Sequence, residues 1–272
     1  MSIRVRAPAS TANLGPGFDC VGVALDLWNE LELEEGDGEP DLGHLGVRAF
    51  CRVAEAEGWT FRWTDRIPRE RGLGSSASVI ALGLVAGSLV AGKDGDPEAL
   101  LAAGTKLEGH ADNLAAALAG GVCLTWGGHI ARIARRTPAE PVLIVPPETY
   151  ATVAARTSLP PTVAHSDATA SLARASVLAA GLAAGDANLF AAALEGDRLH
   201  EPYRRDQTPI LAEVREELPT GALGATLSGA GPAVVVWTEP DATETCAEEL
   251  RVRYLQAEVR VLSVAAEGAG PA

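Results

Sequence analysis

The chain has 272 residues, enough for one large or two modest domains at roughly 150 residues each. It carries 22 Lys and Arg against 36 Asp and Glu, and the net charge of −14 excludes the broad basic face that a general nucleic-acid or anionic-membrane binder needs. Hydrophobic residues make up 47% of the chain, too many for a disordered protein. Aromatic residues make up only 4%, so Ala, Leu and Val must build most of the core.

The cysteines and the apolar segments predict where the protein resides. Cys20, Cys51, Cys123 and Cys246 are widely spaced without a CxxC pair, which indicates reduced thiols rather than a zinc or redox site. The first ten residues have no apolar core of signal-peptide length. The longest apolar stretch, residues 79–91, is interrupted by Gly and Ser and is too short to span a membrane. We therefore expect a cytoplasmic protein with neither a membrane nor a nucleic-acid partner.

The first half of the chain alternates between strand and helix patterns. Alternating apolar and polar residues predict strands at 3–7, 27–33, 59–63 and 122–126. Apolar periodicity predicts helices at 47–57, 75–91, 97–108 and 113–119. Asp96-Pro97-Glu98 is a typical helix start, with a capping residue, a first-turn proline and an early acid. Gly- and Pro-rich residues predict a turn at 10–17 and loops at 36–46 and 68–74.

The second half begins after a segment, 138–147, that is typical of a linker and includes a short strand at 142–145. Helices are expected at 168–184, 187–199, 210–218 and 242–255, and strands at 222–227, 233–238 and 259–264. Because helices and strands mix without strict alternation, the pattern favours an α+β fold with two lobes. We place the domains at residues 1–140 and 141–272.

The strongest local signal for a binding site is RGLGSSAS, residues 71–78, a Gly-rich loop that opens a helix. Glycines allow the backbone to approach a ligand closely, and the N–H groups that begin a helix attract phosphate. A plain reading is a tight turn followed by a helix that Ser75 or Ser76 caps. The P-loop pattern GxxxxGK[ST] is absent, and polar residues stand where a dinucleotide-binding fold needs a strand before its glycines, so neither of those sites is favoured.

Three further segments combine Gly with polar residues. SGAGP, residues 228–232, lies between two apolar strands and is either a hairpin turn or a second phosphate contact. PASTANLGPGFD, residues 8–19, is either a capped turn or a binding loop. In EGHADN, residues 108–113, Asp112 is expected to be a helix N-cap, and Glu108 together with a Ser hydroxyl would suit Mg²⁺.

Taken in order, PASTANLGPGFD, RGLGSSAS and LSGAGPA resemble the three signatures of the GHMP small-molecule kinases. EGHADN with the following LAAALAGG is similar to E-G-H-P-D-N-x-A-P-A-L-x-G-G of the homoserine kinases in that superfamily, and DRLHEPYR, residues 197–204, to their D-R-L-H-x-P-Y-R. The resemblance covers residues 4–265 and implies a ribosomal-protein-S5-like first lobe and a ferredoxin-like second lobe. It implies phosphorylation of L-homoserine by ATP and Mg²⁺, on the way to threonine.

The resemblance also implies which residues form the site. ATP is expected at Arg71, Gly72, Leu73, Gly74, Ser75, Ser76, Ala77, Ser228, Gly229 and Gly231, and Mg²⁺ at Ser76 and Glu108. Homoserine is expected at Asp19, His110, Asn113, Thr152, Arg156 and Arg204. The expected catalytic residues are Asn113, Asn13 and Asp19, with Asn113 standing where mevalonate-type relatives carry an Asp base.

Some alternatives stay open at this point. His44 stands where an Asn near the adenine is usual, and the 36–46 region is shorter than its counterpart, so the adenine contacts are not predicted. A sister kinase with a mevalonate or diphosphocytidyl substrate would want an Asp in place of Asn113, and a silent nucleotide-binding relative would not need the full set of site residues. The sequence is compatible with a monomer or a homodimer.

Overall fold

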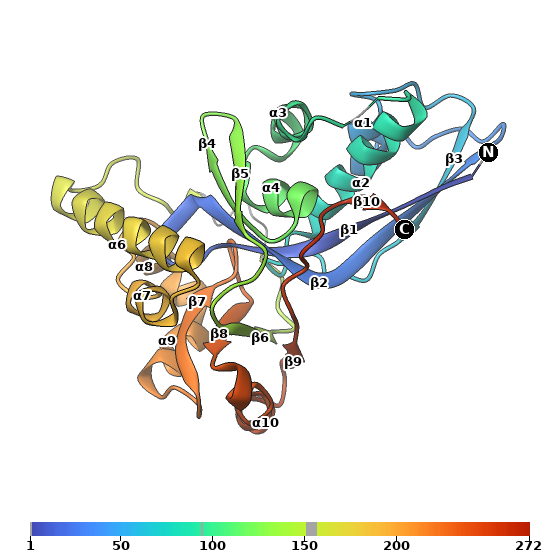
Figure 1. The fold of residues 1–272 in the computed structure, drawn as a ribbon. Helices are drawn as coiled ribbons and strands as arrows, with labels where there is room; N and C mark the ends of the chain where they lie inside the picture. Colours follow the sequence, from blue (N-terminus) through green and yellow to red (C-terminus); the bar gives the residue numbers. More distant parts are fainter. Residues whose placement is uncertain (1, 94, 151–156) are drawn as a thin grey trace.

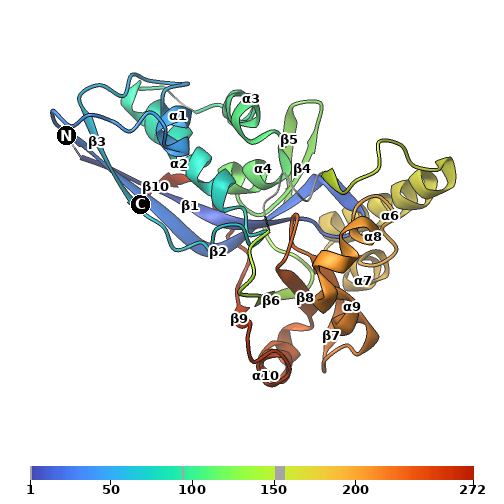
Figure 2. The same cartoon turned by 180° about the vertical axis from the view of Figure 1, so that it is seen from behind.

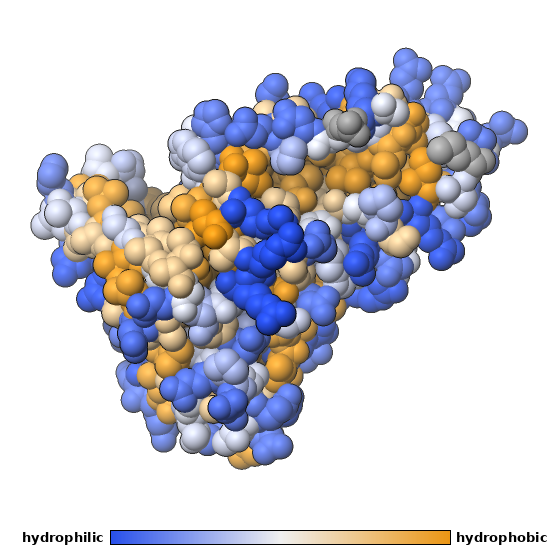
Figure 3. Space-filling model, in the orientation of Figure 1, coloured by the Kyte–Doolittle hydropathy of each residue, from blue (hydrophilic) through white to orange (hydrophobic). Residues whose placement is uncertain are grey.

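A computed structural model describes residues 2–93, 95–150 and 157–272 of the chain. The described residues form two antiparallel sheets with helices packed against them (Figure 1). Figure 3, in the same orientation, shows hydrophilic residues over much of the outer edge, with apolar residues in patches between them. Within the described residues, no helix has the length and hydropathy to cross a bilayer.

The first sheet is organised around one long hairpin of β1 (Ser2–Asn13) and β2 (Gly17–Glu35). In the described residues, this six-stranded sheet has the order β10-β1-β2-β4-β5, and β3 also pairs with β2. These further strands are β3 (Trp59–Thr64), β4 (Val122–Trp126), β5 (His129–Ala134) and β10 (Gly270–Pro271). The turn expected at residues 10–17 is wrong in extent, because β1 continues through Asn13, which pairs with Gly17 across a bulge.

Four helices cover one face of this sheet, as the view from behind also shows (Figure 2). They are α1 (Leu45–Phe50), α2 (Ser75–Val90), α3 (Pro97–Glu108) and α4 (Asp112–Ala119). The fully buried Leu31 and Leu33 of the sheet share a core with Phe50 and Ile80 of the helices. The helix expected at 47–57 is shorter than predicted, because the chain turns after Phe50 to begin β3, which pairs with the end of β2.

The second sheet, four-stranded in the described residues, has the order β7-β8-β6-β9. Its strands are β6 (Glu140–Val145), β7 (Ala222–Leu227), β8 (Val234–Thr238) and β9 (Glu258–Val261). The first strand in chain order lies between the third and the fourth, which is the ferredoxin-like arrangement, so that expectation is confirmed. The residues expected to link the lobes therefore include an inner strand of this sheet, β6, and the strand β5 that precedes it was missed.

The helices of the second half are α6 (His165–Ala184), α7 (Ala187–Ala193), α8 (Glu201–Arg204), α9 (Pro209–Glu216) and α10 (Thr243–Arg253). Helices α9 and α10 pack on one face of the second sheet through Val214 and Leu250. The helix expected at 187–199 ends at Ala193, and the chain then turns at Gly196, whose φ of 85° is left-handed.

The other face of the second sheet shares a core with the first sheet. Trp237 and Val235 of β8 belong to the same buried cluster as Leu14 and Leu25 of the β1–β2 hairpin and Phe190 of α7. The chain also returns after β9 to the first sheet, where β10 pairs with β1. This shared core fixes the loop between β1 and β2 against the second lobe, and the candidate site lies beside that loop.

Candidate active site

A cavity of about 300 Å³ collects residues from every sequence motif described above. Its walls come from the β1–β2 turn, the loop that opens α2, the α3–α4 junction, helix α8 and the β7–β8 turn. The lining residues are Asn13, Phe18, Asp19, Glu70, Gly72, Leu73, Gly74, Ser75, Ser76, Glu108, His110, Asp112, Asn113, Arg204, Gly229 and Ala230.

The Gly-rich loop is shaped by two glycines rather than by a serine cap. Gly74 is the N-cap of α2 with φ 63°, so the expectation that Ser75 or Ser76 caps the helix is wrong. A Cβ on Gly74 would lie 2.0 Å from Ser10 Oγ, and one on Gly72 would lie 2.1 Å from Ser228 O. Both positions therefore require Gly. With no side chain over them, the N–H groups that begin α2 can receive an anion from the cavity.

The β7–β8 turn closes against this loop. Ser228 Oγ lies 2.7 Å from Gly72 O and 2.9 Å from Thr11 Oγ1, so its hydroxyl joins the three glycine-containing segments. Gly229 and Ala230 line the cavity, whereas Ser228 and Gly231 are not among its lining residues. We interpret the Ser228 hydroxyl as the group that holds the β7–β8 turn against the Gly-rich loop. Gly229 and Ala230 of that turn then face the cavity.

Besides Ser228 and Gly231, two more residues of the expected ATP set, Arg71 and Ala77, are not among the lining residues. The Arg71 guanidinium donates to the carbonyl of Pro146 at 2.9 Å and to that of Pro147, which directs it toward the segment after β6. Ala77 is fully buried in the core under α2. Of the expected ATP set, residues 72–76 and Gly229 are the ones that line the cavity.

Ser76 and Glu108 meet across the cavity, although 31 residues separate them in the sequence. Ser76 Oγ donates to Glu108 Oε2 at 2.5 Å, beside the start of α2. In the described residues, no group of three or more His, Cys, Asp and Glu side chains could hold a metal ion. A pair of oxygen donors next to a phosphate site nevertheless fits Mg²⁺, which keeps several waters and takes its remaining ligands from phosphates.

The α3–α4 junction brings four polar residues to the cavity: Glu108, His110, Asp112 and Asn113. Asn113 Oδ1 accepts a hydrogen bond from Ser10 Oγ at 2.9 Å, which leaves the amide NH₂ for the cavity side. His110 Nδ1 is buried without a hydrogen-bond partner, 3.9 Å from Glu108 Oε1. A buried ring nitrogen without a partner is suited to a ligand that supplies one.

The expectation that Asp112 serves as an N-cap is wrong. Ala111 is the N-cap of α4 and Asp112 is the first helical residue, with its Oδ1 accepting from the Asn113 N–H at 2.7 Å. Asp112 is 97% buried and lines the cavity together with Asn113, because the helix starts one residue earlier than predicted. The two adjacent residues therefore both line the cavity.

The turn between β1 and β2 is strained and held by one asparagine. Asn13, Leu14 and Asp19 all have positive φ, a conformation that non-Gly residues seldom adopt. Asn13 Oδ1 accepts from the Asp19 N–H at 2.9 Å, and Asn13 Nδ2 donates to Gly229 O at 2.8 Å. Both ends of the Asn13 amide are thus used within the protein, and we interpret Asn13 as a brace that presents Asp19 to the cavity.

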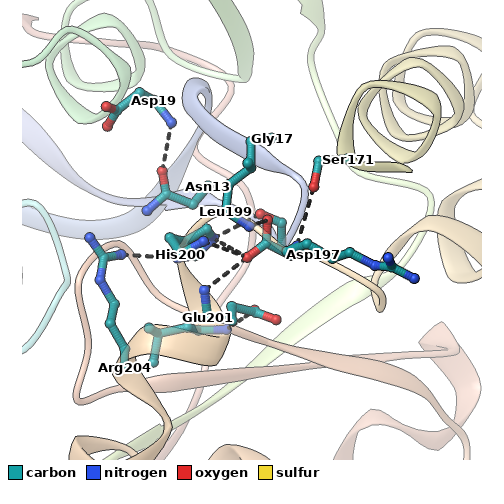
Figure 4. A network of polar contacts seen from close by, with 12 residues as sticks. Asn13, Gly17, Asp19, Ser171, Asp197, Leu199, His200, Glu201 and Arg204 are labelled. Carbon is teal, nitrogen blue, oxygen red and sulfur yellow. Dashed lines mark hydrogen bonds and ion pairs between the residues drawn. The ribbon is translucent and has the colours of Figure 1, made fainter. Parts of the chain in front are cut away.

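Helix α8 contributes a buried arginine. Arg204 is 98% buried, lies 5.6 Å from the ring centre of Phe18, and donates to Gly229 O at 3.3 Å and to His200 Nδ1 at 3.0 Å. Figure 4 shows it reaching toward His200 from below the β1–β2 turn. The two other residues expected to bind the substrate, Thr152 and Arg156, lie outside the described residues.

Sequence reasoning missed several residues of this site: Ser10, Phe18, Glu70, Asp112 as a lining residue, and His200. Ser10 and Phe18 lie within the motif PASTANLGPGFD, and His200 lies within DRLHEPYR. The motifs therefore indicated that these residues belong to the site, but not which residues they contact. Glu70 has φ 54° and precedes the Gly-rich loop, and nothing in its sequence pattern indicates that it faces the cavity.

Comparison with known proteins agrees with this geometry. Residues 44–121 match the model of the GHMP kinases N terminal domain, and residues 178–255 match that of the GHMP kinases C terminal domain. The homoserine kinase of Gloeobacter violaceus is 40% identical, over 91% of this chain and 90% of its own. The homoserine kinase of Desulfitobacterium hafniense is 34% identical, over 98% of this chain and 99% of its own. The crystal structure of homoserine kinase from Cytophaga hutchinsonii aligns with a TM-score of 0.88 at 26% identity, covering 100% of this chain and 97% of that one.

Proposed function

This chain belongs to the GHMP kinase family, within its homoserine kinases, and we propose that it transfers the γ-phosphoryl group of ATP to the side-chain hydroxyl of L-homoserine. The products are ADP and O-phospho-L-homoserine, an intermediate on the way to threonine. The observation that carries the proposal is the meeting of the Gly-rich loop, the Asn113 amide and the Arg204 guanidinium around one cavity. These groups match the phosphates, the hydroxyl and the carboxylate of the two substrates.

The phosphates of ATP would lie against residues 72–76. The backbone N–H groups at the start of α2 and the positive end of its dipole favour the negative charge of the phosphates. Gly72 and Gly74 keep that approach free of side chains, since a Cβ on either would already clash with the protein. Phosphoryl transfer depends mostly on positioning and charge stabilisation, which a rigid backbone cradle supplies.

Mg²⁺ would be held by Ser76 Oγ and Glu108 Oε2, the oxygen pair beside the cradle. When bound, the ion would offset the charge on the β- and γ-phosphate oxygens. Without it, the Glu108 carboxylate accepts the Ser76 hydroxyl and keeps both side chains on the cavity wall.

Homoserine would lie between Asp19, Asn113 and Arg204. The Arg204 fork suits the carboxylate, because a guanidinium binds carboxylate through two parallel hydrogen bonds. Asp19 would pair with the ammonium group, and the unshared His110 Nδ1 offers one more polar contact. Thr152 and Arg156 join this set by resemblance to the family's T-x-x-x-R motif.

The hydroxyl of homoserine would be oriented by Asn113 and would attack without a protein base. Because Ser10 occupies Asn113 Oδ1, the amide faces the cavity with its NH₂, which can donate to the hydroxyl oxygen but cannot take its proton. The proton would leave to a phosphate oxygen or to water. Asp112 is the rival base, since it lines the same cavity.

The Asp112→Asn variant decides between these two routes. Asparagine keeps an oxygen that can accept the Asn113 N–H, so the local hydrogen bond survives. We expect kcat to stay within about tenfold of wild type, whereas the loss of a general base costs about 10²–10⁴-fold. Steady-state kinetics with a melting curve check this, and a folded Asp112→Asn with kcat about 10³-fold down would make Asp112 the base.

The substrate itself is tested by a coupled ADP-release assay with homoserine, mevalonate, galactose and shikimate. We expect turnover with homoserine far above that with the other three. Preference for mevalonate would favour a sister kinase, in spite of Asn113. Nucleotide binding without any turnover would instead identify a silent relative that kept only the phosphate loop.

A further inference from the structure

Next to Arg204 lies a buried polar cluster whose members Asp197 and His200 are not among the residues that line the cavity. Asp197 accepts backbone N–H groups from Leu199 at 3.0 Å, His200 at 2.9 Å and Glu201 at 2.8 Å, and so fixes the start of α8 (Figure 4). The side chains of Asp197 and His200 are both fully buried. His200 is not among the residues that line the cavity, so we consider its effect on the residues that do.

The contacts of His200 define its tautomer. His200 Nε2 lies 2.8 Å from Gly15 O and 3.7 Å from Asp197 Oδ2, two atoms that can only accept, so Nε2 carries the proton. His200 Nδ1 lies 3.0 Å from Arg204 Nη1, which can only donate, so Nδ1 is the acceptor. The ring is therefore neutral, and burial lowers its pKa, against the opposing effect of Asp197 and Glu201.

These contacts join two of the chain segments that form the cavity. Gly15 belongs to the β1–β2 turn, which also presents Asp19, while Arg204 belongs to α8. Phe18, the second residue of β2, stacks on the His200 ring at 4.9 Å. The turn packs closely against the second half of the chain at Gly15, since a Cβ there would lie 2.8 Å from Leu194 O. His200 thus connects the Arg204 guanidinium to the chain segment 15–19, which ends at Asp19.

We propose that His200 is a positioning residue that sets the guanidinium of Arg204 against the β1–β2 turn, so that the carboxylate and the ammonium of one amino-acid substrate are bound at a fixed spacing. This rests on the proposed function, in which Arg204 and Asp19 hold those two groups. The guanidinium is planar in any case, and an acceptor on one of its nitrogens fixes the orientation of that plane and so the directions of the remaining N–H donors. Pre-organisation of this kind reduces the ordering cost of binding.

Three variants separate the two contacts of the ring. His200→Asn keeps an acceptor near the Nδ1 position for Arg204 and loses the longer reach to Gly15 O. His200→Gln keeps a donor near the Nε2 position for Gly15 and loses the acceptor at Nδ1. His200→Leu loses both. Thr208→Val is the matched control, because the buried Thr208 hydroxyl donates to the backbone carbonyl of Arg204 at 2.9 Å and does not touch the guanidinium.

The measurements are KM for homoserine and for ATP, homoserine binding by calorimetry without nucleotide, and thermal unfolding. We expect His200→Gln and His200→Leu to raise KM and the dissociation constant for homoserine about tenfold, the size of one hydrogen bond to a charged group. His200→Asn should stay within about threefold, and KM for ATP should change little in all of them. Thr208→Val should lower the melting temperature without the homoserine effect.

Several outcomes overturn the proposal. Equal homoserine affinity in His200→Asn and His200→Gln would show that the acceptor for Arg204 does not matter. Affinity losses that follow the melting temperatures, Thr208→Val included, would reduce His200 to a core residue. A wild-type protein that phosphorylates another alcohol and does not bind homoserine would overturn the proposed function and this inference together, whereas the first two results leave the proposed function intact.

Discussion

The two walls of the cavity are built in different ways. The wall toward the expected phosphates is backbone: Gly72 and Gly74 approach other chain segments so closely that no side chain fits, and Ser76 and Glu108 are its main polar side chains. The wall toward the expected amino acid presents the buried Arg204 side chain, which is braced from outside the cavity: His200 contacts its guanidinium, and Asp197 contacts His200. A backbone cradle suits a group common to many kinases, whereas a braced side-chain wall suits the one substrate that distinguishes this enzyme.

This difference predicts that single substitutions on the two walls have separable effects. Changes on the side-chain wall should act on homoserine and leave ATP almost unaffected. Changes at Ser76 and Glu108 should act on the phosphoryl-transfer step and on Mg²⁺. A substitution on either wall that changes KM for homoserine and KM for ATP equally would show that the two walls depend on each other structurally.

The largest effect is expected for Arg204→Leu. Removing one partner of a buried charged contact costs about 2–5 kcal/mol, so kcat/KM for homoserine should fall by about 10³-fold, while KM for ATP should change by less than threefold. Arg204→Lys keeps the charge without the fork and should lose about tenfold less. Steady-state kinetics with each substrate varied in turn measure this split. Equal losses for both substrates would assign Arg204 a structural role.

Ser76→Ala tests the other wall. Loss of one transition-state donor costs about 10²–10³ in kcat, and we expect about a 10²-fold fall in kcat with the melting temperature preserved. The fold should tolerate the change because Gly74, rather than Ser76, caps α2. Ser75→Ala, one residue earlier on the same wall, is the natural comparison. Full activity in Ser76→Ala would show that the hydroxyl serves neither Mg²⁺ nor phosphate.

Glu108→Gln should act on the metal requirement. The substitution removes the charge but keeps an oxygen near Ser76 Oγ, so the cavity should retain its shape. We expect the Mg²⁺ concentration for half-maximal rate to rise about tenfold, the size of one charge-assisted contact, with a lower kcat at saturation. Titrations with Mg²⁺ at fixed ATP measure it. An unchanged Mg²⁺ dependence would make Glu108 a residue that only closes the end of α3.

How well the sequence predicts each wall follows from what builds it. The helix after RGLGSSAS was predicted at 75–91 and is observed at Ser75–Val90, because apolar periodicity and glycines are local signals. The Asp96 cap of α3 is likewise confirmed by its contact with the Glu98 N–H. By contrast, the bonds from His200 to Gly15 and from Ser10 to Asn113 join residues 185 and 103 positions apart. No periodicity carries such pairings, since they depend on how the two sheets pack.

Errors of one residue at element boundaries had the largest consequences for the site. Placing the start of α4 at Asn113 made Asp112 a cap and turned its side chain away from Asn113. In the structure α4 starts at Asp112, and both residues line the cavity. Similarly, residues 10–13 were expected in a turn, but as part of β1 they bring Ser10 to Asn113 and Asn13 to the β7–β8 turn.

The smallest effect expected is a pH dependence of stability that originates in the side-chain wall. Burial lowers the pKa of His200 in the folded protein from its ordinary value of about 6.5. Below pH 6.5 the unfolded chain therefore binds a proton that the folded protein does not bind. The free energy of unfolding should fall as the pH decreases from about 6.5, by at most about 1.4 kcal/mol per pH unit for one proton. Above pH 7.5 this contribution should be constant.

Urea unfolding at pH 5.5, 6.5 and 7.5 measures that slope, and His200→Asn should make it shallower, because the variant has no group at this position to titrate. The control is His44→Gln in the first lobe. His44 packs on Trp63 at 4.4 Å, and burial also lowers its pKa, so its loss should reduce the slope independently of the homoserine site. The two reductions should add, since distant sites are usually independent. An unchanged slope in His200→Asn would mean that the ring is protonated alike in the folded and unfolded chains, which contradicts the neutral tautomer on which the positioning of Arg204 depends.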